Sequence, residues 1–379
     1  MNEKEVQKTK NIIADDMLLT TGIPTSAGSK MLDGYQSFIE SEAIMRVKAA
    51  GYTLVGKADV GEFGIDLIGE TSARGAFVCN GTLKNASAEA LIKGDATGAL
   101  CLDVNGSPRR AAAQSGLVCL KPTYGAISRY GVISVVPSGE TVSILAKSTE
   151  DCRDLFYALA NPNETECTSV RRVAVLTSLN DGIEEGVKQV IGTAIPKLQN
   201  SGISTTYIEN RTISLAKAVW NSLLCAELCK STARYDGIRY GYRAESFSSL
   251  EELYTNSRTE GFGDLVKAAI LWGSEVLSAQ NYKNIYEKAL RVRRVIADEF
   301  SKLFEDFDAV LLPTCSKIEY TEEEVARDKY IAFEENSYTA PASLTGLPAV
   351  VAGGVQLIGK ANAEHALLDI ANILSGEGR

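Results

Sequence analysis

A serine and two arginines stand together where the sequence predicts the start of a helix. The run consists of Ser107, Pro108, Arg109 and Arg110, and it follows a strand-like apolar stretch at 99–104. A serine before a proline is typical of a helix N-cap with proline in the first turn, and that role alone would explain Ser107. A serine hydroxyl becomes a good nucleophile only beside a base. The two arginines would form either a structural pair or, together with the N–H groups of the helix start, an anion site.

The single histidine narrows which base could serve this serine. His365 is the only histidine among the 379 residues, and it falls in a C-terminal helical stretch. A Ser-His-Asp triad would have to include it, and a metal site with several histidine ligands cannot form. We therefore interpret His365 as a surface residue of a helix.

The cysteines do not suggest a metal site either. All eight are scattered and none forms a C-x-x-C pair, which is typical of buried, reduced thiols. Cys225 and Cys229 would share one helix face, but no histidine is close in the sequence to complete a zinc site. Phosphate-loop and dinucleotide-binding motifs are missing as well, so we expect neither a metal nor a cofactor.

Composition and charge exclude further classes of protein. Hydrophobic residues make up 45% and charged residues 23% of the chain, which is typical of globular proteins. The net charge of -9 argues against direct nucleic-acid binding, which usually requires a basic surface. The first ten residues are polar, and no stretch reaches the ~18 apolar residues of a membrane span. We expect a cytoplasmic protein with no membrane association.

Strand and helix patterns alternate along most of the chain. Strands are predicted at 52–58, 99–104, 117–120, 132–136, 142–147, 172–177, 203–208 and 309–314, and a hairpin over Gly353 and Gly354. Helices are predicted at 43–50, from a cap at Thr149 to 161, at 183–200, 214–231 and 363–375, and over most of 248–307, including one long amphipathic helix at 276–306. This alternation predicts an α/β fold with a mixed, largely parallel sheet between helical layers.

Several long segments identify a family. They are LKPTYGAISRYG at 120–131, SKMLDGY at 29–35, AAGYTLVGKADVGEF at 49–63, YDGIRYGYR at 235–243, EELYTNSRTEGFGDLVK at 251–267 and TGLPAV at 345–350. In this order they resemble the amidase-signature proteins, and among these the A subunits of glutamyl-tRNA(Gln)/aspartyl-tRNA(Asn) amidotransferases. The resemblance implies one amidase-signature domain over 1–379, with a sheet core from 12–150 and 309–379 and a helix-rich part at 171–307. It also implies that ATP and magnesium belong to a partner subunit.

The resemblance implies a serine amidase that works without histidine. In that family a neutral lysine acts as the base through a second serine, and backbone N–H groups before the nucleophile hold the oxyanion. The family segment DTGGSIRQPA corresponds to 103–112 here, so Ser107 takes the nucleophile position, and Asp103 and Arg109 match. The oxyanion positions are Val104, Asn105 and Gly106. Asn105 replaces a glycine, which puts the shape of that loop in doubt because glycine adopts positive φ more freely.

The other two triad positions differ from the family. Counting without gaps places Leu83 at the second serine, with Ser87 four residues further on, and places Asp15 at the lysine. Leucine cannot relay a proton. A shifted alignment around 8–17, which requires an insertion, would bring the fragment Lys8-Thr9-Lys10-Asn11 to the lysine motif, and one around 81–89 would bring Ser87 to the second serine. Alternatively, a buried Asp15 with a raised pKa would act as the base.

The positions that would hold a glutamine substrate also differ. The family segment KRRIMLG corresponds to 267–273, where Ala268 and Ala269 replace both arginines, one of which would grip a carboxylate. Asn336 replaces the aspartate that would meet the substrate amino group. Both ends of an amino-acid clamp are therefore changed.

Two functions remain open. The first is an inactive, binding or regulatory paralogue that engages a B- or C-subunit-like protein, a second copy of itself or a small ligand. Triad members act as a unit, and acid–base catalysis is worth ~10²–10⁴-fold, so loss of two members would leave ~10⁻⁴ or less of normal activity. The second is an active amidase or glutamine amidotransferase subunit using Ser107. It requires Asp15 or Lys84 within ~3 Å of Ser107.

Overall fold

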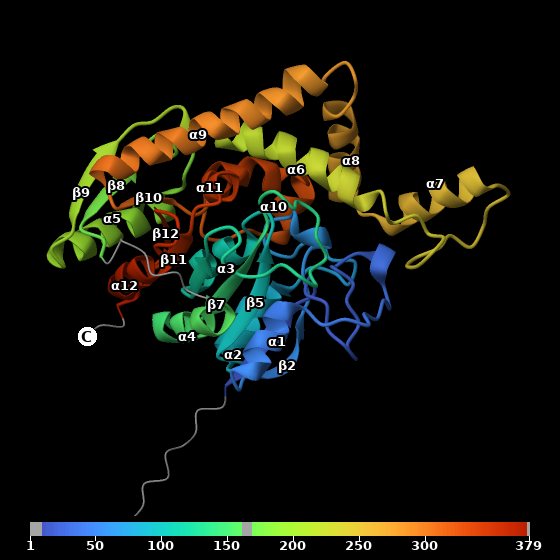
Figure 1. Cartoon of the computed structure of the whole chain (residues 1–379), viewed down its shortest axis with the longest axis horizontal. Helices are drawn as coiled ribbons and strands as arrows, with labels where there is room; N and C mark the ends of the chain where they lie inside the picture. The colour runs from blue at the N-terminus through green and yellow to red at the C-terminus, as the bar shows by residue number, and fades with distance from the viewer. Residues whose placement is uncertain (1–9, 161–168, 377–379) are drawn as a thin grey trace, which may run out of the picture.

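One large mixed sheet forms the centre of the molecule (Figure 1). The computed structural model describes residues 10–160 and 169–376. Ten strands follow the order β2-β1-β5-β7-β6-β11-β12-β10-β8-β9. Their bounds are β1 Asn11–Asp15, β2 Thr53–Ala58, β5 Gly98–Asp103, β6 Val118–Lys121, β7 Thr141–Ala146, β8 Arg172–Leu176, β9 Ser204–Ile208, β10 Ala309–Pro313, β11 Ala349–Ala352 and β12 Val355–Gly359. A small separate sheet pairs β3 Val78–Cys79 with β4 Thr82–Leu83.

The predicted α/β fold with a mixed sheet is confirmed. Parallel pairs occupy the two outer parts of the sheet, β2-β1-β5 and β10-β8-β9. The centre is antiparallel and includes the predicted hairpin of β11 and β12. Because β8 and β9 extend this same sheet, the segment predicted to be helix-rich also contributes two strands to it.

The strand predicted at 132–136 is wrong. Within this segment Val132 makes only a single bridge, to Leu18. The buried carboxylate of Glu140 instead accepts hydrogen bonds from the backbone N–H groups of Val135 and Val136, at 2.9 and 2.8 Å. A side chain therefore satisfies backbone donors that a neighbouring strand would otherwise have taken.

Helices cover both faces of the sheet (Figure 1). On one face lie α2 Ala86–Lys93 and α3 Ser107–Ser115, and on the other α1 Glu42–Ala49, α4 Thr149–Leu159 and α12 Glu364–Ser375. The remaining helices are α5 Glu185–Asn200, α6 Ala216–Thr232, α7 Leu250–Gly261, α8 Asp264–Val276, α9 Glu287–Asp306, α10 Glu322–Arg327 and α11 Ile331–Thr345. Short 3₁₀ turns are Lys30–Leu32, Glu62–Gly64 and Ile213–Leu215. Figure 1 shows α7 projecting away from the body of the molecule.

Two predicted helix boundaries need correction. The long helix expected at 276–306 is interrupted, because α8 ends at Val276 and a π-helical turn, Tyr282–Tyr286, precedes α9. The side chain of Asn281 donates to the Glu275 carboxylate at 2.5 Å and helps to hold this break. The cap of α4 is Ser148, whose hydroxyl accepts from the Asp151 N–H, and Thr149 is the first helical residue.

None of the helices in the described part of the chain is long and apolar enough to cross a membrane.

Candidate active site

Ser107 stands at the junction between β5 and α3. The chain leaves β5 at Asp103 and turns at Gly106, whose φ of 90° lies in the left-handed region. A Cβ at this position would come within 2.4 Å of the Thr339 side chain, so only glycine fits. Gly106 is the N-cap of α3 and Ser107 is its first residue, so the predicted capping role of Ser107 is wrong. Among the described residues, the half-buried Ser107 hydroxyl has no hydrogen-bond partner.

Ser107 opens into a very small cavity. Its volume is about 20 Å³, and the polar residues that line it include Asp15, Ser87 and Ser107. A cavity of this size holds about one water molecule, whereas sites for small ligands usually measure several hundred Å³. The structure thus brings the predicted nucleophile and the residue at the lysine position to one small cavity. Of the alternative fragment Lys8-Thr9-Lys10-Asn11, Lys8 lies outside the described residues, and Lys10 is exposed with its ammonium over the Tyr52 ring at 5.1 Å.

Asp15 ends β1 and is almost fully buried. Its carboxylate accepts hydrogen bonds from two backbone N–H groups, of Met17 at 3.0 Å and Leu102 at 2.6 Å. Burial raises the pKa of Asp15 to about 7, although these hydrogen bonds and the charge of Lys57 oppose the shift. No hydrogen bond joins the Asp15 carboxylate to the Ser107 hydroxyl, both of which the structure describes.

The second-serine position lies outside this cavity. Leu83 belongs to β4, is 1% exposed, and donates its N–H to the Tyr320 carbonyl at 2.8 Å. Ser87, in the first turn of α2, lines the cavity instead. The Lys84 ammonium is turned to Glu319, at 3.0 Å. Of the residues in this segment, the structure therefore brings Ser87 to the predicted nucleophile, and neither Leu83 nor Lys84.

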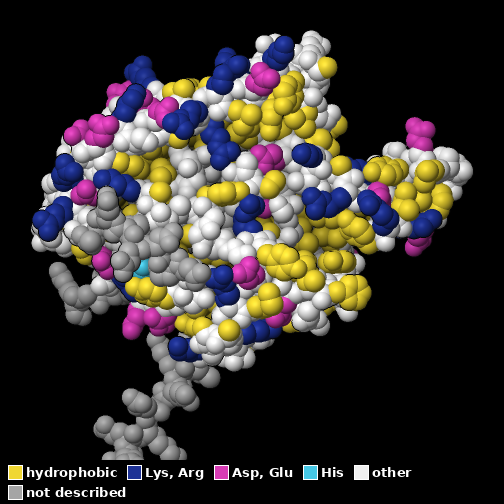
Figure 2. Space-filling model, viewed as in Figure 1, with side chains coloured by type: hydrophobic (Ala, Val, Ile, Leu, Met, Phe, Trp, Pro, Cys, Tyr) yellow, Lys and Arg dark blue, Asp and Glu magenta, His cyan; other side chains and the backbone are white. Residues whose placement is uncertain are grey.

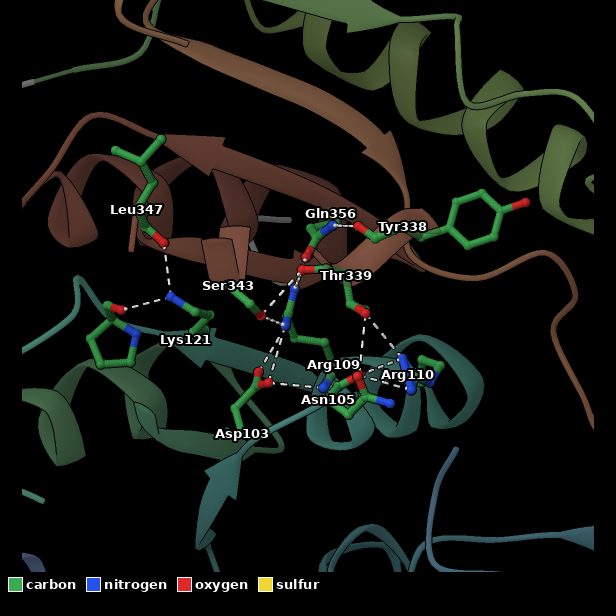
Figure 3. A network of polar contacts seen from close by, with 12 residues as sticks. Asp103, Asn105, Arg109, Arg110, Lys121, Tyr338, Thr339, Ser343, Leu347 and Gln356 are labelled. Carbon is green, nitrogen blue, oxygen red and sulfur yellow. Dashed lines mark hydrogen bonds and ion pairs between the residues drawn. The ribbon is translucent and has the colours of Figure 1, made fainter. Parts of the chain in front are cut away.

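Asp103 and Arg109 form a fully buried ion pair (Figure 3). Two guanidinium nitrogens contact the two carboxylate oxygens, at 2.7 and 3.1 Å. The other N–H groups donate to the Thr339 carbonyl, the Gln356 amide oxygen and the Ser343 hydroxyl. These five bonds use every donor of an arginine. Burial opposes ionisation of Asp103, but the Arg109 charge prevails and lowers its pKa.

Arg110 is equally enclosed. Its guanidinium donates to the Asn105 carbonyl through both terminal nitrogens, each at 2.8 Å, and to the Thr339 hydroxyl at 3.1 Å. Longer bonds reach the carbonyls of Leu67 and Asp66. Of the two interpretations of the arginine pair, these contacts favour the structural one, because no donor remains for an anion.

The oxyanion positions are also engaged with the protein. The Gly106 N–H donates to Asp103 at 3.0 Å, and Val104 is fully buried. The Asn105 amide group donates to the Ile65 carbonyl at 2.7 Å, and its oxygen accepts from the indole N–H of Trp220 at 2.9 Å. The left-handed turn falls on Gly106, and Asn105 keeps negative φ, so the predicted difficulty at Asn105 does not arise.

Trp220 is a residue of the site that sequence reasoning missed. It lies on α6, is 0% exposed, and its ring occupies the space beside Gly139, where a Cβ would come within 2.3 Å of it. The signal available in the sequence was weak, because a tryptophan in a helical stretch is most simply a core residue. Only the fold shows that this ring lies against the loop before Ser107.

The two clamp positions lie on helices that pack against α6. Ala269 on α8 and Asn336 on α11 are both 0% exposed. The Asn336 amide group donates to the Asn221 amide oxygen at 2.7 Å. Ala269 offers only a methyl group. Neither position therefore presents a charge to a bound amino acid.

Comparisons with known proteins agree on one family. The family model described as Amidase matches residues 15–368. The A subunit of the glutamyl-tRNA(Gln) amidotransferase of Symbiobacterium thermophilum is 34% identical over 394 residues, which cover 95% of this chain and 81% of the relative. Its counterpart in Streptococcus pneumoniae is 33% identical over 390 residues, covering 94% and 80%.

Solved structures agree with these relatives. The A subunit of the same amidotransferase from Thermotoga maritima has a TM-score of 0.78 at 26% identity, covering 96% of this chain and 82% of that one. The 6-aminohexanoate cyclic dimer hydrolase has a TM-score of 0.82 at 18% identity, covering 97% and 84%. At that identity the second likeness concerns the fold alone.

Proposed function

This chain belongs to the amidase family, and we propose that within it the chain is a relative of the glutamyl-tRNA(Gln) amidotransferase A subunits whose amide-cleaving activity is lost or strongly reduced. It then acts by binding. The observation that carries this proposal is the cavity of about 20 Å³ at Ser107, in which an aspartate stands at the position of the family lysine. There is room for about one water molecule and none for an amide with its side chain.

The absence of a suitable base among the described residues supports the same conclusion. The Asp15 carboxylate is held by two backbone N–H groups and does not contact Ser107. Among nearby lysines, Lys57 pairs with Asp16 at 2.8 Å and Lys84 with Glu319 at 3.0 Å. Lys121, whose pKa burial lowers to about 7, donates to the carbonyls of Pro122 and Leu347. Without a base, the Ser107 hydroxyl is a weak nucleophile.

Residues beyond the cavity at Ser107 add a further argument. The Trp220 indole donates to the Asn105 amide oxygen and so ties the loop before Ser107 to α6. The positions that would grip a glutamine are a buried alanine, Ala269, and an asparagine, Asn336, bonded to Asn221. Free glutamine therefore has no charged partner at these two positions.

Ammonia release tests this proposal. The purified chain would be incubated with glutamine, asparagine and simple aliphatic and aryl amides, beside Ser107→Ala and, as a matched control on the same helix, Ser115→Ala. We expect no release above that of Ser107→Ala from any substrate. Release that Ser107→Ala abolishes and Ser115→Ala keeps would overturn the proposal.

That second outcome would point to an active amidase with Asp15 as the base. Two features support this alternative: burial raises the pKa of Asp15 to about 7, and Asp15, Ser87 and Ser107 line one cavity. It predicts that Asp15→Asn abolishes the release and that Ser87→Ala reduces it.

The binding role concerns a protein partner. The relatives are named as subunits, and we propose a B- or C-subunit-like protein, or a second copy of this chain, as the partner. Size-exclusion chromatography with light scattering, of the chain alone and mixed with such a partner, tests this. We expect a stable complex. A strictly monomeric chain that forms no complex would contradict the binding role.

A further inference from the structure

A second, larger pocket lies on the surface, away from Ser107. It has a volume of about 660 Å³ and shares no lining residue with the small cavity. Three segments form it: the loop after β6, the C-terminal half of α6, and the connection between α8 and α9. Its volume falls in the range of pockets that bind small molecules. Figure 2 shows hydrophobic side chains gathered over the start of α9, with Lys and Arg side chains around the face below it.

We call this the cationic pocket, because three of its lining residues are Arg129, Lys230 and Arg234. Glu227 is the one acidic residue among the described residues that line it, and one of its carboxylate oxygens accepts the Ser138 N–H at 2.9 Å. In a chain of net charge -9, such a group of cations is a local exception. This local positive charge favours the binding of an anion in the pocket.

Most side-chain N–H groups of Lys230 and Arg234 have no acceptor among the described residues. Both are exposed, and neither has an ion-pair partner among the described residues. Arg234 donates only its Nε, to the Ser231 carbonyl at 2.8 Å, which leaves four N–H groups for a ligand. Lys230 lies in the last turn of α6 and Arg234 just beyond its end, and both line the same pocket.

The opposite wall of the pocket is held in place. Arg129 lies over the Tyr124 ring at 4.9 Å, donates to the Tyr124 hydroxyl at 2.7 Å and pairs with the buried Glu140 at 3.0 Å. The Tyr124 hydroxyl donates to the Pro137 carbonyl at 2.6 Å. These bonds leave three of the five Arg129 donors free. A wall that is already ordered loses little entropy when a ligand binds.

A residue of α9 also holds the loop that forms this wall. The Arg293 guanidinium donates to the Ser138 carbonyl at 2.8 Å and to the Ser138 hydroxyl at 3.0 Å. On the open side, Tyr286 adds a half-buried ring to the lining. The pocket thus combines free cationic donors with the faces of Tyr124 and Tyr286.

We propose that the cationic pocket binds a small organic anion through its phosphate or carboxylate group. Lys230, Arg234 and the free donors of Arg129 hold the oxyanion, since guanidinium groups match the planar arrangement of such oxygens. A flat part of the ligand lies against the tyrosine rings. This binding involves no bond breaking and does not depend on whether Ser107 is active.

Titration calorimetry tests the proposal. Inorganic phosphate, adenosine monophosphate and succinate would be titrated separately into the full chain at low and at physiological salt. We expect at least one probe to bind, more weakly at the higher salt. In the double variant Lys230→Gln/Arg234→Gln, the affinity should fall at least about tenfold. The control Lys217→Gln, on the same helix and outside the pocket, should bind as the parent does.

The probes distinguish the sources of the anion. Tighter binding of adenosine monophosphate than of phosphate would assign a ring-bearing phosphate, equal binding would assign the oxyanion alone, and binding of succinate alone would assign a carboxylate. Both substituted side chains are exposed, and a melting curve checks the fold of each variant. If no probe binds, or if the double variant binds as tightly as the parent, the proposal is wrong.

Discussion

Two pairs of cationic residues show how differently this molecule uses the same chemistry. Arg109 and Arg110 are buried, and every N–H of Arg109 donates to a protein acceptor. Lys230 and Arg234 are exposed and lack ion-pair partners within the described residues. The residue types alone would suggest anion binding in both places. The difference lies in whether donors remain free, which only the folded arrangement shows.

The cavity at Ser107 and the cationic pocket differ in the same way. The cavity at Ser107 is small, with room for about one water molecule, and is lined by a carboxyl group whose hydrogen bonds come from the backbone. The cationic pocket is larger and lies on the surface, and two of its cationic residues, Lys230 and Arg234, are exposed. The proposed binding function of this chain therefore lies at a surface other than the family's site.

Breaking the buried pair should have the largest effect. Arg109→Met leaves Asp103 as an uncompensated buried charge, and removing one partner of a buried ion pair costs about 3–5 kcal/mol of unfolding free energy. Urea unfolding measures this loss. The matched change in the open pocket, Arg234→Met, should leave the unfolding midpoint unchanged within error. Equal destabilisation by both variants would remove the distinction between the two regions.

The second prediction concerns pH and the enclosed carboxyl group. Because the folded pKa of Asp15 is raised from 3.8 to about 7, the folded state binds this proton more tightly than the unfolded state does. Its contribution to stability is therefore fully present below the unfolded pKa and is lost as pH rises towards 7. Between pH 5 and pH 8, the loss is about 3 kcal/mol by the linkage relation.

Asp15→Asn tests that sign, because it removes the titrating group. The fall in unfolding free energy from pH 5 to pH 8 should be about 3 kcal/mol smaller in the variant than in the parent. Urea unfolding at both pH values, with equal m values for the two proteins, provides the measurement. An unchanged pH dependence would mean that the Asp15 carboxyl group is not enclosed as described.

The smallest of these effects concerns the tryptophan that fills the site. Trp220→Phe keeps an aromatic ring but removes the pyrrole part of the buried indole together with its hydrogen bond to Asn105, and should lower the unfolding free energy by about 1–2 kcal/mol. Trp272→Phe on α8, where the side chain is 46% exposed, is the matched control and should have little effect. If Trp220→Phe is neutral, the indole does not hold the loop before Ser107.

Patterns of residues close in sequence predicted most strands and helices of the fold. They predicted only part of the contacts around Ser107. The β11–β12 hairpin and the strand that leads to Ser107 follow from alternation and turn residues close in sequence. The strand expected at 132–136 is missing because Glu140 takes the backbone donors, a side-chain contact that periodicity does not show. Likewise, nothing in the sequence near Ser107 indicates that Trp220, more than a hundred residues later, fills the adjoining space.

Sequence patterns were also insufficient to assign the second-serine position. Ungapped counting points to Leu83, which the structure places in the core, whereas Ser87 reaches the cavity. A serine four residues away was visible in the sequence. Which of the two faces Ser107 depends on how α2 packs against β5 and α3, and only the assembled sheet and helices fix that packing.

Covalent labelling of Ser107 tests the central claim most directly, because it requires no knowledge of a natural substrate. The chain and its Ser107→Ala variant would be incubated with a small fluorophosphonate that reacts with activated serines, and the intact mass would be measured. The closed cavity and the lack of a base predict no adduct on either protein. A stoichiometric adduct on the parent that is lost in Ser107→Ala would contradict the account and show that Ser107 is an accessible, activated nucleophile.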